Sequence, residues 1–508
     1  MSKRNQIIVS FLIGNALFLL CFFLNPLGIP KQANMVLSIA VLMLSLWFTE
    51  SLPIGIVAII PLIAFPISGI LKIDQALINY VDKVVFLFLG GFVLGLALEK
   101  WGLHKRIALG IVKITGTSPN RIILGFIIAT AFISMWISNT ATTMMMYPIA
   151  LSVNALIELN YKGKGRVKNF SLVLMLITAY ASNIGGITTI IGTPPNTVLI
   201  GLMEKSFDLN IGFSQWFLIC FPMGVLILAI MYLLLTLVIF PNKMEKNAIS
   251  RDLISDEYQK LGKMSRQEWI VAIVFIQTCL LWIFREQIIL LIHGIDPATS
   301  TKFKFILPIY RFETGIWLYD KWAINFDDTA VAMWGALLMF LIPSGSKTSI
   351  MIMPLRELKK VKWGILLLFG GGLCLAMAMD KSGLMKLVAE EISVRYSDSG
   401  HLVMIIILTL AAVFLSELMS NVALVTVFVP IVGSIAVSMG VNPMLYCLPV
   451  TLGATCAFML PMGTPPNAIV YASRKIKLYQ MASAGFMLNI ISSVFISAFT
   501  YLMVDLVF

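Results

Sequence analysis

Two stretches of this sequence share one pattern: SMWISNTATTMMMYP at residues 134–148 and SELMSNVALVTVFVP at 416–430. The first Ser, the Ser-Asn pair and the Pro recur at the same spacing, and we call these stretches the SN phrases. A second shared phrase, GTPPN, follows each copy at 192–196 and 463–467. All four place polar, helix-breaking residues in apolar surroundings. At membrane depth such backbone is tolerated only where it lines a cavity or is buried in protein.

The composition is that of a polytopic membrane protein. Of 508 residues, 59% are hydrophobic and only 12% charged, whereas soluble domains carry about 25% charged residues. The net charge of +12 comes from basic residues in short loops between apolar runs, which does not fit a nucleic-acid partner. The six cysteines lack paired spacing and the three histidines are scattered. We therefore expect no disulfide framework, metal cluster or cofactor.

Apolar segments long enough to cross the bilayer, at about 20 residues each, predict eleven transmembrane helices. They fall near residues 7–25, 34–50, 53–70, 83–99, 168–190, 214–240, 267–292, 327–343, 361–379, 443–461 and 480–507. Two further apolar segments, 119–156 and 401–439, carry the SN phrases at their middles. We expect these to enter the membrane, break and return on the same side, as re-entrant hairpins.

The basic residues test this topology, because cytoplasmic loops are enriched in Lys and Arg. With the N-terminus inside, about two thirds of the 37 Lys and Arg residues fall in cytoplasmic segments. The bias holds only if both SN segments turn back instead of crossing. The topology therefore predicts a multi-pass protein with a cytoplasmic N-terminus and an extracellular C-terminus.

The repeat extends beyond the SN phrases. LGGFVLGLALEKWGL at 89–103 matches FGGGLCLAMAMDKSGL at 369–384, and the topology places the two copies in opposite orientations. The fold class is thus all-α with an inverted-topology repeat, an architecture of many secondary transporters. Amphipathic pieces follow at 100–116 and 381–397, and they are either helices lying on the membrane that couple a moving part to a fixed one or simple interfacial loops.

The predicted topology and repeat divide the chain into four parts. They are a first transmembrane helix (1–33), repeat 1 (34–240, with an unwound helix at 192–196), a cytoplasmic connector (241–266) and repeat 2 (267–508, with an outside insertion at 293–326 and an unwound helix at 463–467).

The broken helices suggest what the site binds. A helix break exposes N–H groups at one new end, which attract anions, and C=O groups at the other, which can ligate a small cation such as Na⁺. Small polar residues at the breaks add donors and acceptors without a fixed charge: Ser138, Asn139, Thr140, Thr193, Asn196, Ser420, Asn421, Thr464 and Asn467. No phosphate-loop spacing indicates an ATP site, and no nucleophile–base pair or metal cluster indicates an enzyme. Glu417 stands beside the second SN pair where the first copy has Met135, and both a structural and a proton-coupling role are open.

These residues resemble the divalent anion/sodium symporter family over nearly the whole chain. The resemblance rests on SNT at 138–140, GTPPN at 192–196, SN at 420–421 and MLPMGTPPNAIVYAS at 459–473. It implies a plasma-membrane, elevator-type homodimer with a scaffold domain and a mobile transport domain that carries both hairpins and both unwound loops.

The resemblance also implies particular site residues. Sodium site 1 would comprise Ser134, Ser138, Asn139 and Gly192, and sodium site 2 Ser416, Met419, Asn421 and Gly463. The substrate would meet Ser138, Asn139, Thr140, Thr193, Ser420, Asn421, Val422, Thr464 and Pro465. Two positions depart from the family pattern. Val422 stands where the family usually has a second SNT threonine, which removes a hydroxyl worth about 1 kcal/mol, and Ser416 replaces a common threonine.

The function we expect is secondary transport of C4–C5 dicarboxylates such as succinate, malate, fumarate or 2-oxoglutarate. Sodium symport is the first interpretation of the coupling, and sodium-independent exchange is a close alternative. An ion channel built around the hairpins is a more distant one.

Overall fold

The structure is a computed structural model that describes most of the chain. The described residues are 3–49, 52–116, 118–160, 164–241, 244, 258–293, 327–346, 349–396 and 400–508. Part of the expected connector and nearly all of the expected insertion at 293–326 lie outside the described residues.

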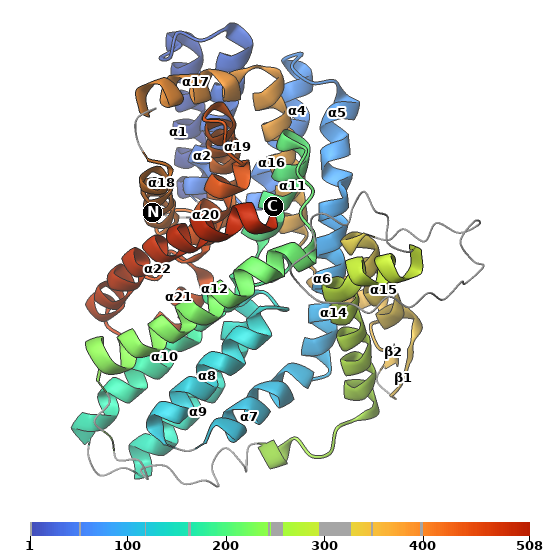
Figure 1. The fold of residues 1–508 in the computed structure, drawn as a ribbon, viewed down its shortest axis with the longest axis vertical. Coiled ribbons are helices and arrows are strands. Elements are labelled where there is room, and N and C mark those ends of the chain that lie inside the picture. Colours follow the sequence, from blue (N-terminus) through green and yellow to red (C-terminus); the bar gives the residue numbers. More distant parts are fainter. Residues whose placement is uncertain are drawn as a thin grey trace.

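The described chain is helical apart from one short β-hairpin (Figure 1). The first half contains α1 (Lys3–Leu24), α2 (Lys31–Phe48), α3 (Ile54–Val57), α4 (Ile60–Ile67), α5 (Ile73–Leu77), η1 (Ile78–Val81), α6 (Lys83–Lys100), α7 (Leu103–Thr115), α8 (Pro119–Ser134), α9 (Asn139–Asn160), α10 (Lys164–Ile187), α11 (Pro194–Phe207), α12 (Phe213–Leu233) and η2 (Leu234–Ile239). The second half contains α14 (Arg266–His293), α15 (Asp328–Leu341), β1 (Pro343–Ser346), β2 (Ser349–Met351), η3 (Leu355–Lys360), α16 (Trp363–Lys381), α17 (Leu384–Tyr396), α18 (His401–Ser416), α19 (Asn421–Ser438), α20 (Pro443–Thr455), α21 (Pro465–Tyr471) and α22 (Leu478–Val507).

Nine segments in the described part of the chain are long and apolar enough to cross a membrane, where the sequence predicts eleven. Three predicted spans are shorter as helices. The 53–70 span is divided into α3 and α4, the 327–343 span ends as α15 at the β-hairpin, and the 443–461 span leaves the helix after Thr455. Conversely, α19 is a candidate span by itself, although the sequence assigns it to a hairpin.

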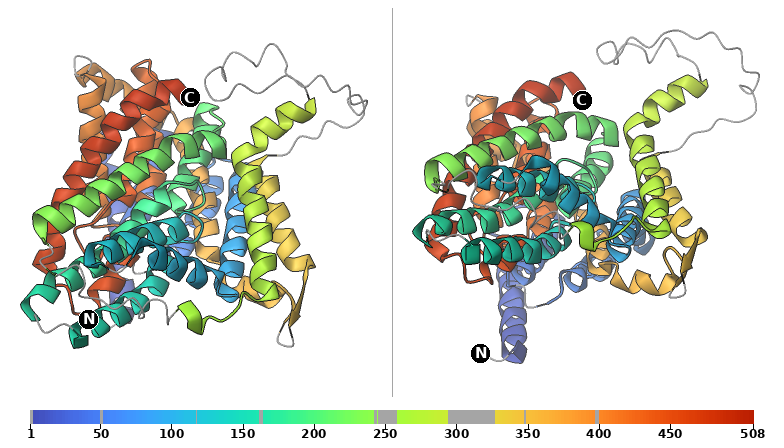
Figure 2. Two further views of the ribbon diagram at one scale, coloured as in Figure 1. Left: turned by 60° about the horizontal axis from the view of Figure 1, so that its bottom comes forward. Right: turned by 90° about the horizontal axis from the view of Figure 1, so that it is seen from below.

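The helices pack in two groups (Figures 1 and 2). One group, the α16 group, contains α1 to α6 and α14 to α16. The other, the α10 group, contains α8 to α12 and α18 to α22, and helices from both halves of the chain meet in it. Thus α10 packs against α20 and α21, and α12 lies along α22.

Each repeated GG phrase has one glycine against its own group of helices and one against the other group. In the first copy, a methyl on Gly90 would collide with Ala332 of α15, and Gly91 faces Ile191 of the α10 group. In the second copy, Gly372 similarly faces Thr426 of α19, where a Cβ would come within 2.6 Å of the Thr426 methyl group. The absence of side chains at these positions lets α6 and α16 approach their neighbours closely, as small residues do between membrane helices.

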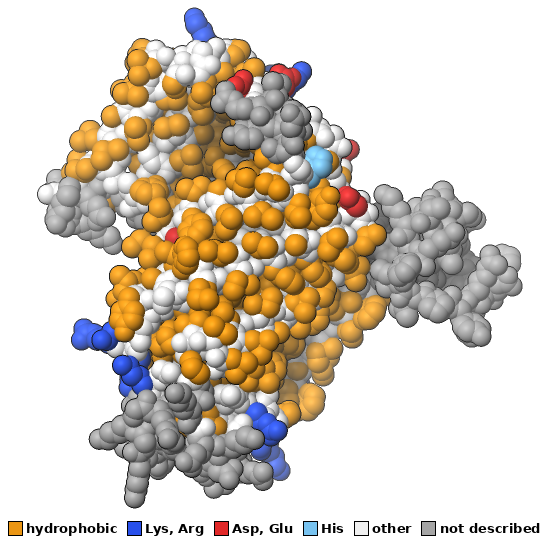
Figure 3. Space-filling model, turned by 60° about the vertical axis from the view of Figure 1, so that its left-hand side comes forward, with side chains coloured by type: hydrophobic (Ala, Val, Ile, Leu, Met, Phe, Trp, Pro, Cys, Tyr) orange, Lys and Arg blue, Asp and Glu red, His pale blue; other side chains and the backbone are white. Residues whose placement is uncertain are grey.

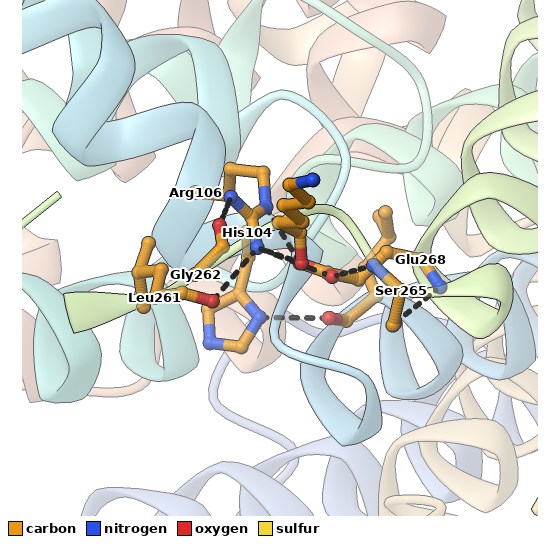
Figure 4. A network of polar contacts seen from close by, with 8 residues as sticks. His104, Arg106, Leu261, Gly262, Ser265 and Glu268 are labelled. Carbon is orange, nitrogen blue, oxygen red and sulfur yellow. Dashed lines mark hydrogen bonds and ion pairs between the residues drawn. The ribbon is translucent and has the colours of Figure 1, made fainter. Parts of the chain in front are cut away.

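The amphipathic helix α7 packs along α8 and is clamped to the start of α14 (Figure 4). Arg106 donates to both carboxylate oxygens of Glu268, at 2.7 and 3.2 Å, and to the carbonyl oxygens of Leu261 and Gly262. Glu268 also accepts from the backbone of Ser265, an arrangement typical of a helix capping box. This bidentate, partly buried ion pair joins the two halves of the chain.

The outer surface of α12 and α22 is apolar. Exposed side chains include Leu218 and Val225 on α12 and Val494 and Leu502 on α22. Figure 3 shows hydrophobic side chains across the middle of one face, with charged side chains toward its ends. Such a large apolar surface is expected of a protein whose solvent is lipid.

Candidate functional site

Both SN phrases interrupt a helix. In the first copy, α8 ends at Ser134 and α9 begins at Asn139; in the second, α18 ends at Ser416 and α19 begins at Asn421. The paired helices contact each other in each copy. Each phrase therefore places the end of one helix beside the start of the next within the α10 group.

Both GTPPN phrases follow an unwound segment. The chain leaves the helix over residues 188–193 and 456–464, and Pro194 and Pro465 begin the next helices. The unwound segments therefore begin before the predicted ranges 192–196 and 463–467 and end at the first proline of each phrase. The last three residues of each predicted range are helical, because proline is well suited to the first turn of a helix.

The Asn of each GTPPN phrase holds the preceding loop. The amide of Asn196 donates to the carbonyl oxygens of Gly186 (3.0 Å) and Thr189 (2.8 Å). The amide of Asn467 donates to those of Ala457 and Leu460, both at 3.0 Å. Since buried carbonyl groups need hydrogen-bond partners, these two asparagines stabilise the unwound backbone inside the fold.

A chain of hydrogen bonds links the first SN phrase to the second GTPPN phrase. Asn139 Nδ2 donates to Asn183 Oδ1 at 3.4 Å, and Asn183 Nδ2 donates to Thr464 Oγ1 at 3.1 Å. Asn183 is buried on α10. Sequence reasoning missed this residue, although a further Ser-Asn pair, at 182–183, could have drawn attention to it. Asn183 connects the two halves at their signature residues.

Three residues of the expected sodium site 1, Ser134, Asn139 and Gly192, lie around a cluster of oxygen atoms, whereas the hydroxyl of the fourth, Ser138, lies beside Lys362. Ser134 Oγ lies 2.9 Å from Asn139 Oδ1 and 2.7 Å from the carbonyl oxygen of Ser182. The single hydroxyl hydrogen of Ser134 thus faces two acceptor oxygens, so that lone pairs of these oxygen atoms stay available to a cation. A methyl on Gly186 would collide with Asn139 Oδ1, and one on Gly192 with the Gly186 carbonyl oxygen. This compact, oxygen-only set fits a small hard cation such as Na⁺.

The second SN phrase is built differently. Ser416 Oγ donates back to the Val413 carbonyl oxygen at 2.8 Å. Asn421 Oδ1 is buried and has no hydrogen-bond partner among the described residues. An unpartnered buried carbonyl oxygen is costly unless a ligand satisfies it. The expected sodium site 2 residues therefore also present an acceptor for a cation.

Glu417 anchors the second unwound loop. Its buried carboxylate accepts from the backbone N–H groups of Met459 (2.7 Å) and Leu460 (2.8 Å) and from Asn489 Nδ2 (2.8 Å). A methyl on Gly463 would collide with it. In the first copy a hydroxyl makes the corresponding link, from Thr189 to the Met135 carbonyl oxygen. Three N–H donors suit a carboxylate that is a structural acceptor.

The tip of the first SN phrase faces a cavity of about 300 Å³ between the two groups of helices. Ser138 and Thr140 line it from the tip, Gly91 and Gly95 line it from α6, and Lys362 lines it from the loop before α16. A second cavity of about 700 Å³ adjoins it, and the two share Glu99, Ile137, Ala141 and Met144 as lining residues. Together they extend from the connector residues Lys260 and Leu261 to the SN tip.

The remaining predicted residues do not line the smaller cavity. Thr193 and Thr464 are buried at the N-cap positions of α11 and α21, where the Thr464 side chain accepts from the backbone N–H of Asn467, and Pro465 is exposed at the start of α21. Ser420 occupies the N-cap position of α19 without a side-chain capping hydrogen bond. Val422 is buried among apolar side chains. The structure thus joins the first SN tip to Thr464 through Asn183, and the rest of the second set lies apart from the cavity.

Lys362 brings a positive charge to the smaller cavity from the loop before α16. Lys362 Nζ lies 3.4 Å from Ser138 Oγ. Desolvation by the surrounding protein lowers the pKa of Lys362, although its side chain stays accessible, and the carboxylate of Glu99 acts in the opposite direction.

Four helix breaks in two repeated pairs, with a buried cluster of oxygen atoms at one of them, are typical of secondary transporters with broken helices. The family model described as "Sodium:sulfate symporter transmembrane region" matches residues 5–506. The chain therefore belongs to this family, the divalent anion/sodium symporters, which is a family of membrane transporters and not of enzymes.

Curated relatives match along the full chain. The sodium-dependent dicarboxylate transporter SdcS of Staphylococcus saprophyticus is 36% identical over 504 residues, which cover 98% of this chain and 91% of that protein. SdcS of Staphylococcus aureus strain USA300 is 35% identical over 508 residues, covering 98% and 92%. The YdaH transporter of Alcanivorax borkumensis superposes with a TM-score of 0.59 at 11% identity, covering 92% of this chain and 98% of that one, and the likeness is one of fold alone.

Proposed function

We propose that this chain is a sodium-coupled symporter of C4–C5 dicarboxylates such as succinate, malate, fumarate and 2-oxoglutarate. The names of its SdcS relatives support both the cation and the substrate class. The observation that carries the proposal is the oxygen cluster of Ser134 and Asn139, which Asn183 connects to Thr464. A cation bound there would order the residues that contact the dianion, and this is a physical basis for coupling.

The two groups of helices support an elevator mechanism. The α10 group, with both SN phrases and both unwound loops, would be the transport domain, and the α16 group the scaffold. At one end the groups are joined by the ion pairs Lys205–Asp82 (3.0 Å) and Lys83–Glu204 (2.6 Å). The two cavities near the first SN phrase lie at the other end, beside basic loops. We infer that the cavities face the cytoplasm, since basic loops favour that side.

The remaining parts of the proposal rest on topology and on the family. They are a plasma-membrane location, a cytoplasmic N-terminus, an extracellular C-terminus, a homodimer, and the division into repeats 34–240 and 267–508.

Uptake into proteoliposomes tests the function. We expect labelled succinate to accumulate against its gradient when Na⁺ is outside, and to stop accumulating when choline replaces Na⁺. Uptake that needs a preloaded dicarboxylate and ignores Na⁺ would establish the alternative, sodium-independent exchange. Flux that does not saturate would instead favour a channel.

A further inference from the structure

Lys362 places a positive charge beside the tip of the first SN phrase. The SN phrase belongs to the α10 group, whereas Lys362 belongs to the α16 group. It precedes α16, and its ammonium lies 3.4 Å from the Ser138 hydroxyl across the smaller cavity. Ser138 and Thr140 line the same cavity. A group bound at these hydroxyls would therefore lie within reach of the Lys362 charge.

The other lysine that lines the smaller cavity, Lys360, and the nearby Lys100 are already engaged. Lys360 pairs with Glu357 at 2.8 Å, and Lys100 donates to Ser349 Oγ and the Ile352 carbonyl oxygen. Lys362 forms no ion pair with any carboxylate that the structure describes. Since an ammonium has three donors, it retains donors for an anion.

The acidic residue at the smaller cavity is Glu99, which lines both cavities. Its negative charge would repel a dianion entering from this side. Lys362 counters that repulsion at the point where the hydroxyls of the tip stand.

We propose that the Lys362 ammonium binds one carboxylate of the dicarboxylate while the site faces the side with the basic loops. This rests on the proposed function and adds a residue to it. Aligning Gly371 with Gly90 puts Val81 before α6 in the equivalent place, so the first repeat offers no matching cation. Lys362 therefore acts at one face of the membrane only, and it stays with the scaffold when the transport domain moves.

The test compares the two faces. Three variants are reconstituted in proteoliposomes of known orientation: Lys362→Met, Lys362→Arg and the control Lys359→Met, which alters an exposed lysine of the preceding η3. The apparent KM for succinate is then measured separately at each face. Lys362→Met should raise KM about five- to tenfold at the basic face, the size expected for a solvent-accessible charge-assisted hydrogen bond. The other face should change less than twofold, Lys362→Arg should retain most of the affinity, and Lys359→Met should match the wild type.

Equal increases at both faces would overturn the proposal, because they would mean that Lys362 acts only by supporting Ser138. No increase at either face would also overturn it. A wild type without succinate flux would refute the proposed function instead. In that case the rise in melting temperature with succinate or sulfate, measured on the purified wild type and Lys362→Met, decides whether Lys362 holds an anion. An equal rise in both proteins refutes the site.

Discussion

Asn183 donates a 3.1 Å hydrogen bond to Thr464 Oγ1, and its own carbonyl oxygen accepts from Asn139. One buried amide thus connects a residue of the first SN phrase with a residue of the second GTPPN phrase. We infer that a cation bound at the oxygen cluster beside Asn139 would act on the other repeat through this amide.

Asn183→Ala should weaken the link between cation and substrate. We expect sodium-driven succinate uptake to fall at least tenfold and the sodium concentration for half-maximal uptake to rise, because Asn139 and Thr464 each lose a partner. Losing such a partner costs about 1–3 kcal/mol. Asn154→Ala is the matched control, since Asn154 is equally buried and its side chain has no hydrogen bond to a described residue. Similar losses in both variants would contradict this role.

Asn139→Ala and Asn421→Ala should each abolish transport while the protein stays folded. Asn139 contributes an oxygen to the first cluster, and Asn421 presents the unpartnered oxygen of the second. Uptake assays with size-exclusion profiles of the purified variants check the prediction. Normal uptake by both variants would refute the assignment of the two sodium sites.

Gly186→Ala should impair sodium dependence more than folding. The added methyl would collide with Asn139 Oδ1 and push that oxygen out of the cluster. The measurement is succinate uptake against sodium concentration, where we expect a rightward shift of about tenfold or more, corresponding to about 1.4 kcal/mol. Gly110→Ala, where a Cβ has only one ordinary contact at 3.7 Å, serves as the control and should leave the curve unchanged.

Glu417→Gln should lower stability without making transport pH-dependent. The Gln amide would present N–H groups where the backbone of Met459 and Leu460 already donates, and we expect a cost of about 1–3 kcal/mol. A melting curve in detergent measures it. Glu390→Gln, which alters an exposed helical pair with Lys386, should change little. A variant with normal stability and an altered pH profile of uptake would favour proton coupling instead.

Val422→Thr should restore the hydroxyl usual in the family at nearly constant volume. If this side chain meets the substrate, the apparent KM for succinate should fall about fivefold, as expected for one hydrogen bond of about 1 kcal/mol. Val425→Thr, at a buried position on the same helix, provides the control for burying a hydroxyl. An unchanged KM with lower stability would place position 422 in the core only.

Repetition in the sequence predicted where the helices break, because Ser-Asn and GTPPN bring polar backbone into apolar segments. It did not predict that Asn196 and Asn467 hold the unwound loops, since their partners depend on a loop conformation that no spacing reveals. Asn183 and Asn489 escaped prediction for a similar reason. Each stands among other small polar residues of its helix, and only packing shows that Asn183 meets Thr464 and Asn489 meets Glu417.

In the proposed mechanism, the ion pairs at the end away from the two cavities near the first SN phrase would contribute to the balance between conformations. Lys205–Asp82 and Lys83–Glu204 are partly exposed, and such pairs contribute about 0.2–1 kcal/mol each. Two of them bias a two-state equilibrium by at most about thirtyfold. A bias of that size keeps the opposite conformation populated at a few per cent or more. Under the proposed mechanism, thermal motion would then be enough for the protein to alternate between two conformations, and the gradients of solute and ion would determine the direction of net flux.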